Sequence, residues 1–363
     1  MSEDALQSLR DELSAIDRQI LELAARRRDL AEQIGRTKAS AGRPTRDYAR
    51  EVEVFRAARR SADTLGLSHQ LAERILTALI ESSLTVQEQD RLKGSGSGEG
   101  RRALVIGGAG KMGAWFARFL ASQGFEVHTA DPAGPLGDLP HTPDWTTLPL
   151  DDDLVVVAAP LATTAHILGE LAKRRPRGVV FDVGSLKSPL RAGLEALKRA
   201  GVRVTSVHPM FGPDVRLLSG RHVVFVDCGD AGATATARAL FDATMATQVE
   251  MALDDHDRAM AWVLGLSHAV NIAFFSALTR SGEHAPRLAE ISSTTYASQV
   301  EVARRVAAEN PDLYFEIQAD NDFGLTALQA LEQAVTRIRT AVATRDRDAF
   351  VALMERGAAF FAP

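Results

Sequence analysis

The sequence is poor in cysteine. Among 363 residues there is one, Cys228, and it lies in the apolar run HVVFVDC. A single cysteine excludes a disulfide framework and a multi-thiolate metal site. Its apolar surroundings predict a buried, unreactive thiol. We therefore expect functional sites without a metal ion.

Blocks of one charge and long apolar runs are also missing. The formal net charge is −5 and no block of lysine and arginine occurs, so nucleic acid is not an expected partner. The longest apolar run, LVVVAAPLA at 154–162, is far too short to span a bilayer. The acidic segment MSEDALQSLRDE is not a signal peptide. We expect a soluble cytoplasmic protein with no membrane partner.

Three regions of different periodicity follow one another, as the length suggests for two or three domains. Residues 1–92 have an entirely helical pattern. Residues 102–248 alternate β-branched apolar runs with helical stretches, which predicts a parallel sheet covered on both faces. From about residue 232 the strand pattern stops, and residues 249–363 form a helical domain rich in alanine and leucine. The run GSGSGEG predicts a flexible linker at 93–101.

The first helical stretch has an apolar heptad stripe that ends in cations. The stripe consists of Leu6, Leu9, Leu13, Ile16, Ile20 and Leu23. Continuing its rhythm reaches Arg27, then Lys38, at positions where the pattern calls for an apolar residue. A helix over 3–39 would be roughly 55 Å long, too long for a compact monomeric domain. An intertwined dimer would bury it.

The third helical stretch loses its apolar stripe in the same way. Leu76 and Ile80 are followed by Ser83 and Gln87. One interpretation is that Arg27 and Lys38 lie at the edge of the stripe and extend their charged ends outward into solvent. The alternative is an inward-facing polar site, in which a dianionic ligand pairs with the buried cations.

Residues 1–92 resemble the all-helical chorismate mutases. The matching segments are SLRDELSAIDRQILELAARRRDLAEQIGRTK, RPTRDYARE and IESSLTVQ. The resemblance implies that Arg10 and Arg27 hold substrate carboxylates, Arg10 in the partner subunit's site. It further implies that Lys38 and Gln87 donate to the ether oxygen of chorismate. The remaining positions that it assigns to the pocket are Asp47, Arg50, Glu51 and Ser83. A pericyclic rearrangement to prephenate requires fixed donors and no titrating base, which these residues offer.

A glycine-rich turn opens the second region. RALVIGGAGKMGAWFARFLASQG reads as strand, turn and helix, and its G-x-G-x-x-G spacing is typical of dinucleotide binding in a Rossmann-like domain. Asp131 ends the next strand, where a carboxylate accepts from ribose hydroxyls and repels a 2′-phosphate, so NAD is expected rather than NADP. The alternative for Asp131 is a solvated acid that starts a turn. The expected cofactor-binding residues are Gly108, Gly110, Lys111, Met112, Gly113, Asp131 and Pro160.

His208 is the leading catalytic candidate. It follows directly after a predicted strand in SVHPMFGPD, and strand ends of an open α/β sheet face the ligand crevice. A single histidine is often structural, so position alone leaves both interpretations open. His256, His268 and Arg305 lie on the helices that follow, and spacing alone does not single them out.

Residues 102–345 resemble the prephenate dehydrogenase family, and the whole chain resembles bifunctional proteins that join a chorismate mutase to such a dehydrogenase. The matching segments are IGGAGKMG, DVGSLKSPL, VHPMFGPD, DHDRAMAWVLGLSH and ISSTTYASQVEVARRVAAENPDLY. The resemblance implies that His208 takes the proton of the ring hydroxyl while hydride passes to NAD⁺ and CO₂ leaves. Arg305 would bind the ring carboxylate, and His268 would face substrate or the feedback inhibitor tyrosine. Ser185 and Lys187 would line the pocket.

Three alternatives for the second half stay open. Ala297 stands where an arginine often follows the tyrosine of the ISSTTYA segment, which leaves arogenate open as the substrate. A Rossmann domain that senses NAD(H) without chemistry is a second alternative. A hydroxy acid dehydrogenase with an unrelated helical appendage is a third. The expected architecture is an all-α mutase domain, an α/β Rossmann-like domain and an all-α C-terminal dimerisation domain, in a homodimer.

Overall fold

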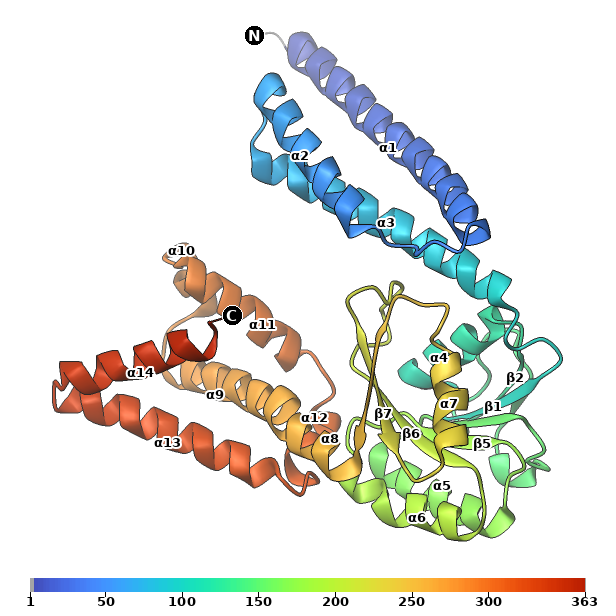
Figure 1. The fold of residues 1–363 in the computed structure, drawn as a ribbon. Coiled ribbons are helices and arrows are strands. Elements are labelled where there is room, and N and C mark those ends of the chain that lie inside the picture. The colour runs from blue at the N-terminus through green and yellow to red at the C-terminus, as the bar shows by residue number, and fades with distance from the viewer. Residues whose placement is uncertain (1–2, 363) are drawn as a thin grey trace.

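The computed structural model describes residues 3–362 and arranges them in three lobes (Figure 1). The N-terminal lobe contains the long helix α1 (Glu3–Ser40), α2 (Tyr48–Leu65) and α3 (His69–Ser95). A sheet domain follows, and a lobe of helices ends the chain. This order confirms the predicted fold class.

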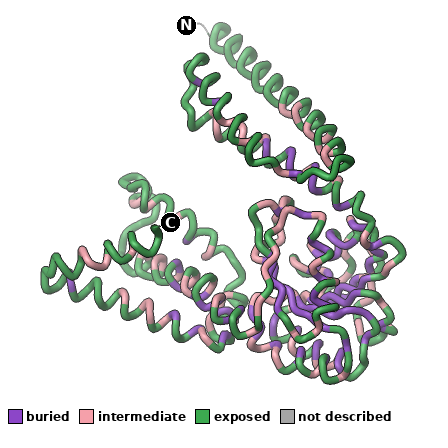
Figure 2. Tube along the Cα trace, viewed as in Figure 1, coloured by how far each residue is buried: buried purple, intermediate pink, exposed green. Residues whose placement is uncertain are grey.

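The helices of the N-terminal lobe begin and end at residues that suit those positions. Asp47 caps α2 and Ser68 caps α3, each through a side-chain oxygen that accepts a backbone N–H. Gly66 ends α2 with φ +68°, a conformation that glycine adopts without strain. Helix α1 has no buried residue, so its apolar stripe is exposed in the single chain (Figure 2).

The sheet has eight strands in the order β3-β2-β1-β4-β5-β6-β7-β8. All neighbouring pairs are parallel except β6 and β7. The strands are β1 (Arg102–Ile106), β2 (Glu126–Ala130), β3 (His141–Thr142), β4 (Leu154–Val157), β5 (Val179–Asp182), β6 (Val204–Pro209), β7 (His222–Asp227) and β8 (Thr247–Ala252).

Strand β8 corrects the expectation that strands stop at about residue 232. It pairs in parallel with β7 over Thr247–Ala252, so the sheet continues past the expected boundary at 248. Its sequence, TQVEMA, contains no buried residue. An edge strand needs no continuous apolar run, and the pattern that marks central strands therefore missed it.

Helices cover both faces of the sheet, as a doubly wound fold requires. One face packs against α4 (Lys111–Ser122) and α7 (Ala231–Ala239) through residues such as Phe116 and Phe181. The other packs against α5 (Leu161–Arg174) and α6 (Arg191–Arg199). Short 3₁₀ turns lie at Trp145–Thr147 and Ser188–Leu190.

The segment expected to be a flexible linker is packed in the structure. Helix α3 continues to Ser95, and Leu92 belongs to the core cluster of the sheet domain. Beyond the helix, Ser97 Oγ donates to Gln123 Oε1 at 2.8 Å and Gly98 N donates to Gln123 O at 2.9 Å. Gly98 is the glycine of this run that a close approach requires, because a Cβ there would lie 2.5 Å from Phe125 N, whereas a Cβ on Gly94, Gly96 or Gly100 would meet nothing within 4 Å.

Much of the C-terminal lobe is exposed (Figure 2), and its exposed residues include large apolar ones. Phe360 and Phe361 are 80% and 82% exposed. The helices are α8 (Leu253–Met260), a π-helical segment (Ala261–Leu266), α9 (Ser267–Arg280), α10 (Ala285–Glu290), α11 (Thr294–Ala307), α12 (Pro311–Ala319), α13 (Gly324–Ala343) and α14 (Arg347–Phe360). So much exposed apolar surface is typical of a subunit interface.

The continuous helix Leu253–Arg280 is long and apolar enough to cross a membrane by length and composition alone. The alanine and leucine content of this region predicts helix, whereas the longest uninterrupted apolar run lies elsewhere, at 154–162. Its first turns carry His256 and Asp257, which are buried. Core helices of water-soluble proteins have the same composition, so the stretch by itself is weak evidence for a membrane span.

The packed linker leads to a prediction for two of its glycines. A Cβ on Gly98 would lie 2.2 Å from Phe125 Cδ2 and 2.5 Å from Phe125 N, whereas one on Gly94 would meet nothing within 4 Å. Gly98→Ala should therefore lower the free energy of unfolding by about 1–3 kcal/mol and speed proteolysis near the linker. The control Gly94→Ala should leave stability unchanged or slightly raised. Equal behaviour of the two variants in thermal unfolding and limited proteolysis would mean that the linker is loose.

Candidate active sites

Four loops meet at one edge of the sheet, because β1, β4, β5 and β6 run parallel. The glycine-rich turn follows β1, and Pro160 follows β4 as the N-cap of α5. Ser185 lies in the loop after β5 and is half-buried. His208 lies at the end of β6 and is 5% exposed. The edge therefore collects residues from every loop that the sequence marked.

A chain of buried hydrogen bonds runs from His208 to a carboxylate. His208 Nδ1 lies 2.9 Å from His256 Nε2, and His256 Nδ1 lies 2.6 Å from Asp257 Oδ1. Both His256 and Asp257 are on α8 and are fully buried. Helix α8 thereby links the C-terminal lobe to the catalytic edge of the sheet.

Asp257 determines which nitrogen of His208 is free. Its carboxylate accepts from the backbone N of Lys187 at 3.0 Å and from the backbone and hydroxyl of Ser188. A carboxylate held this way accepts the Nδ1–H of His256, whose Nε2 then accepts the Nδ1–H of His208. The lone pair of neutral His208 is consequently on Nε2, where it can accept a proton.

The pKa values fit this arrangement. Burial lowers the pKa of His208 well below its usual range, with further lowering from His256 and Lys187. Burial also lowers the pKa of His256, against the opposing hydrogen bond from Asp257. Burial alone would raise the pKa of Asp257, but hydrogen bonds from His256 and Ser188 outweigh it and the net shift is downward. At neutral pH the two histidines are neutral and the carboxylate is charged.

Lys187 was expected to line the substrate pocket, but the structure places it elsewhere. It is fully buried, and its ammonium group donates to Asp182 Oδ1 and Gly184 O at 2.7 Å and to Val207 O at 2.9 Å. All three of its donors are used, so none is available to a substrate. Lys187 does not line an open pocket; it holds the β5 loop to β6, next to His208.

The glycine-rich turn fits a dinucleotide. Gly107 has φ +86°, and a Cβ on Gly113 would lie 2.0 Å from Gly107 O, so helix and turn approach more closely than any side chain allows. A Cβ on Gly108 would lie 2.7 Å from Thr129 Cβ. Gly110 is the N-cap of α4, whose first residues, Lys111 and Met112, follow the turn. Backbone N–H groups at such a helix start attract phosphate.

Asp131 is buried at the end of β2, and its carboxylate binds backbone N–H groups, one of them in the glycine-rich turn. Its Oδ2 accepts from Ala109 N at 3.0 Å and its Oδ1 from Ala133 N at 2.8 Å. Each carboxylate oxygen has a second lone pair, so both can still accept from ribose hydroxyls. Asp131 is thus part of the turn as well as a candidate ligand of the cofactor.

His268 and Arg305 lie on the C-terminal helices. The imidazole of His268 stacks on Tyr314 with ring centroids 4.1 Å apart, and burial lowers its pKa. Its Nδ1 is buried and has no partner in the described residues. Arg305, on α11, is exposed, and the structure of residues 3–362 places no ion pair on it. A single chain does not bring Arg305 to His208 by any described contact.

The mutase candidates gather between α1 and α3. Arg27 Nη1 donates to the carbonyl of Leu79 and the hydroxyl of Ser83, both at 2.8 Å. Both acceptors are neutral, so the charge of Arg27 has no carboxylate partner within residues 3–362. This places Arg27 and Ser83 together, facing inward, rather than on the outside of the stripe.

Lys38 and Gln87 continue the same surface. Lys38 Nζ donates to Thr45 O at 3.1 Å, and Gln87 Nε2 donates to Ala31 O at 2.7 Å. Gln87 Oε1 is buried without a partner in the described residues. Gly35 makes room for this side chain, since a Cβ there would lie 2.6 Å from Gln87 Cγ. The close approach of α1 and α3 therefore depends on Gly35.

The residues at the start of α2 are engaged with one another. Asp47 Oδ1 accepts from Arg50 N as the helix cap, and Arg50 Nη1 donates to Glu53 Oε2 at 2.7 Å. Both are exposed in the single chain. Glu51 accepts two bonds from Arg46, at 2.8 and 2.9 Å. These bonds do not prevent Asp47, Arg50 or Glu51 from contacting a substrate. Arg46, the partner of Glu51, was not among the expected site residues.

Arg10 lies far from the other mutase candidates of its own chain. It precedes Arg27 by 17 positions on one continuous helix, which corresponds to roughly 25 Å. It is exposed. It can therefore complete a site only in another subunit.

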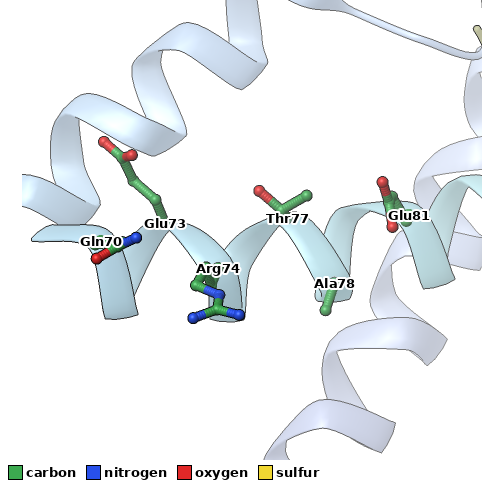
Figure 3. Close-up of a pocket in the computed structure, with 6 residues that line it drawn as sticks. All are labelled: Gln70, Glu73, Arg74, Thr77, Ala78 and Glu81. Atoms are coloured by element: carbon green, nitrogen blue, oxygen red, sulfur yellow. The ribbon is translucent and has the colours of Figure 1, made fainter. Parts of the chain in front are cut away.

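A hollow of about 410 Å³ lies along α3, lined by Gln70, Glu73, Arg74, Thr77, Ala78 and Glu81 (Figure 3). The side chains of this turn project to different sides of the helix in the close-up (Figure 3). Its one cation, Arg74, stands beside the two carboxylates Glu73 and Glu81, which would repel a dianionic substrate, and none of the expected mutase residues lines it. The hollow is a neighbour of the candidate site and not the site itself.

Three supporting residues were missed at the sequence level. Asp182 is the last residue of the apolar strand β5, Asp257 lies within the acidic segment LDDHD of α8, and Glu88 directly follows Gln87. The segment LDDHD did place acids beside His256, which was the one available signal. Cys228 is half-buried rather than fully buried as expected, and burial raises the pKa of its thiol to about 12.

The lowered pKa values of the two histidines predict a pH-dependent stability. Below pH about 6.5 the unfolded chain takes up protons that buried His208 and His256 do not, so stability is complete above that pH and falls as the pH is lowered. The expected slope is about 1–3 kcal/mol per pH unit between pH 6.5 and 5.5. Denaturant unfolding of His208→Asn should give a smaller slope, and exposed His284→Gln the wild-type slope. A slope unaffected by His208→Asn would show that this group is not kept neutral by burial.

Comparisons with known proteins agree with the geometry. A chorismate mutase type II family model matches residues 9–88. Models of the nucleotide-binding and dimerisation domains of prephenate dehydrogenase match residues 142–247 and 253–356.

Individual relatives cover both halves. A T-protein from Enterobacter agglomerans is 27% identical over 97% of this chain and 91% of its own length. A 4-amino-4-deoxyprephenate dehydrogenase from Streptomyces pristinaespiralis is 30% identical over 69% of this chain and 88% of its own. A crystal structure of prephenate dehydrogenase from A. aeolicus, with hydroxyphenyl propionate and NAD⁺, has a TM-score of 0.59 at 19% identity and covers 71% of this chain and 96% of its own. This last likeness shows the fold. The chain therefore belongs to the prephenate dehydrogenase family and carries a chorismate mutase type II domain in front of the dehydrogenase.

Proposed function

We propose that this chain performs two consecutive reactions of tyrosine biosynthesis. The helical domain rearranges chorismate to prephenate, and the second half converts prephenate and NAD⁺ to 4-hydroxyphenylpyruvate, CO₂ and NADH. The observation that carries the second assignment is the buried chain His208–His256–Asp257, which leaves a proton-accepting nitrogen at the carboxyl edge of the sheet. That nitrogen lies at the same edge as the dinucleotide turn.

The dehydrogenase residues supply proton transfer and orientation. His208 Nε2 accepts a hydrogen bond from the ring hydroxyl of prephenate and takes its proton as hydride leaves the same carbon. Bound NAD⁺ supplies the hydride acceptor. The ring carboxylate leaves as CO₂, and its bonding electrons complete the aromatic ring. The imidazolium of His208, stabilised by the relay to Asp257, then returns the proton to the phenolate oxygen.

The residues around the glycine-rich turn would hold the cofactor. The N-terminus of α4 would face the pyrophosphate, and Gly110 would let the backbone approach it closely. Gly108 and Gly113 let the turn and the helix pack closely within the fold. Asp131 would accept from the ribose hydroxyls and repel a 2′-phosphate, which favours NAD over NADP. Ser185 would contact the substrate from the β5 loop. His268 would face the substrate or tyrosine as a feedback inhibitor.

The mutase residues supply position and charge without proton transfer. Arg27 keeps a cation inside the helical domain with no carboxylate beside it, which suits a dianionic substrate. Lys38 and Gln87 would donate to the ether oxygen as its bond breaks and its charge grows. Such donors act because the fold holds them in place before the substrate binds.

We infer a cytoplasmic homodimer, and exposed apolar surfaces support the dimer. The apolar stripe of α1 is exposed in the single chain, and the lobe matched by the dimerisation-domain model exposes many large apolar residues. Arg10 can act only on another subunit's site, given its distance along α1. Exposed apolar helices such as α9 would then be covered by the partner.

An assay with three substrates tests the proposed function. Purified protein with chorismate and NAD⁺ should yield 4-hydroxyphenylpyruvate and NADH, and NADP⁺ should support a much slower reaction. His208→Asn should lower the dehydrogenase kcat by about 10²–10⁴-fold and leave chorismate consumption unchanged. Prephenate formation without any NADH would refute the dehydrogenase assignment. A higher kcat/KM for arogenate than for prephenate would reassign the substrate.

Mixing two inactive variants tests the role of Arg10. Arg10→Ala and Lys38→Ala should each abolish mutase activity. If Arg10 serves the partner's site, half of the dimers in an equal, fully exchanged mixture are hybrids with one intact site of two. Mutase activity should then return to roughly a quarter of wild type. A mixture as inactive as its components, with subunit exchange verified by two different tags, would refute the role of Arg10 in the partner's site.

A further inference from the structure

Glu88 is a buried carboxylate without a cation. It lies on α3 directly after Gln87 and is 2% exposed. No lysine or arginine forms an ion pair with it in the described part of the chain. A charge in such a place is costly unless hydrogen bonds replace its water.

Both oxygens of Glu88 are engaged with the sheet domain. Oε2 accepts from Leu218 N at 2.8 Å, and Oε1 accepts from Met245 N at 2.6 Å. Leu218 belongs to the segment 210–221 between β6 and β7, here termed the bridge loop, and Met245 to the turn before β8. One side chain of the mutase domain therefore holds two separate loops of the sheet domain.

A second contact reaches the bridge loop from the mutase domain. Arg46 Nη1 donates to Ser219 Oγ at 2.6 Å, while its other nitrogens bind the carboxylate of Glu51. The bridge loop is itself held to α4, because Trp115 Nε1 donates to Val215 O at 2.9 Å. Two mutase candidates are therefore linked to the bridge loop through a single residue each. Glu51 is linked through Arg46, and Gln87 through its neighbour Glu88.

Two neighbouring residues at this point of α3 bind different partners. Gln87 lies against α1, bonded to Ala31 and packed over Gly35, whereas its neighbour Glu88 points into the sheet domain. A rotation or shift of this last part of α3 would move the Gln87 amide. Displacements near 1 Å of a positioned group can cost about 10² in rate.

We propose that Glu88 is a positioning residue for the mutase reaction, which places Gln87 by anchoring α3 to the sheet domain, with Arg46 and Ser219 as a secondary anchor. This inference rests on the proposed mutase function. A carboxylate suits the task because it offers two acceptors, whereas a glutamine of the same shape would turn an N–H toward one of the two backbone donors. The mutase site is then built partly by the dehydrogenase domain.

Glu88→Gln in the full-length protein tests the proposal. We expect the mutase kcat to fall at least about tenfold, with the KM for chorismate changed less than about threefold, because Arg27 is held on another turn of α3. The kcat/KM for added prephenate with NAD⁺ should stay within about threefold of wild type. Glu88→Asp keeps two acceptors and should recover part of the lost mutase rate. Glu99→Gln, an exposed change of the same charge in the linker, is the control and should alter neither activity.

The outcomes separate the two ideas. Wild-type protein that does not consume chorismate would refute the proposed mutase function. An active wild type with an equally active Glu88→Gln variant would refute only the positioning role, as would an equal loss of both activities. If Glu88→Gln does not fold, Ser219→Ala removes the secondary anchor without burying a lone charge. It should lower the mutase kcat by about two- to fivefold and spare the dehydrogenase, and an unchanged mutase kcat would count against the proposal.

Discussion

The carboxylate of Asp257 is the interaction on which the dehydrogenase half depends. It is fully buried, and a buried charge persists only when its hydrogen-bonding capacity is filled. The loop after β5 fills it with two backbone N–H groups and the Ser188 hydroxyl, and His256 fills the rest. Satisfying this one group joins α8 to the sheet and orients His208. The hydrogen bonds that satisfy Asp257 thus serve both the packing of α8 on the sheet and the orientation of His208.

Two other buried polar groups also have their hydrogen-bonding capacity filled, one beside the His208 site and one at the junction of the mutase and sheet domains. Lys187 and Asp182 form a fully buried pair in which every ammonium proton has an acceptor, and Ser206 donates to the other carboxylate oxygen. Glu88 is satisfied by Leu218 and Met245 at the junction. Buried polar groups of this kind contribute geometry more than net stability, since apolar replacements of similar size are often as stable. In this chain they hold the loops that carry the reacting residues.

Much of the fold could be predicted because it rests on local periodicity. Six strands have continuous apolar runs, and α1 has a heptad stripe, so both were visible in the sequence. Strand β8 was missed because an edge strand needs no such run. The linker at 93–101 was expected to be flexible because its composition describes how such a segment behaves when nothing packs against it. Composition does not report that Phe125 and Gln123 would pack against Gly98.

The sequence by itself determined the order of the domains and the turn at Gly108–Gly113, and it marked His208 as a candidate, since each depends on residues close together in the chain. Only the tertiary structure decided that Lys187 is enclosed, that Asp257 orients His208 through His256, and that Glu88 joins the two halves. Apart from the adjacent pair His256 and Asp257, those contacts join residues between 3 and 157 positions apart. No periodic pattern encodes such pairs, because burial and hydrogen bonding choose the partner of a polar group only once the elements have packed.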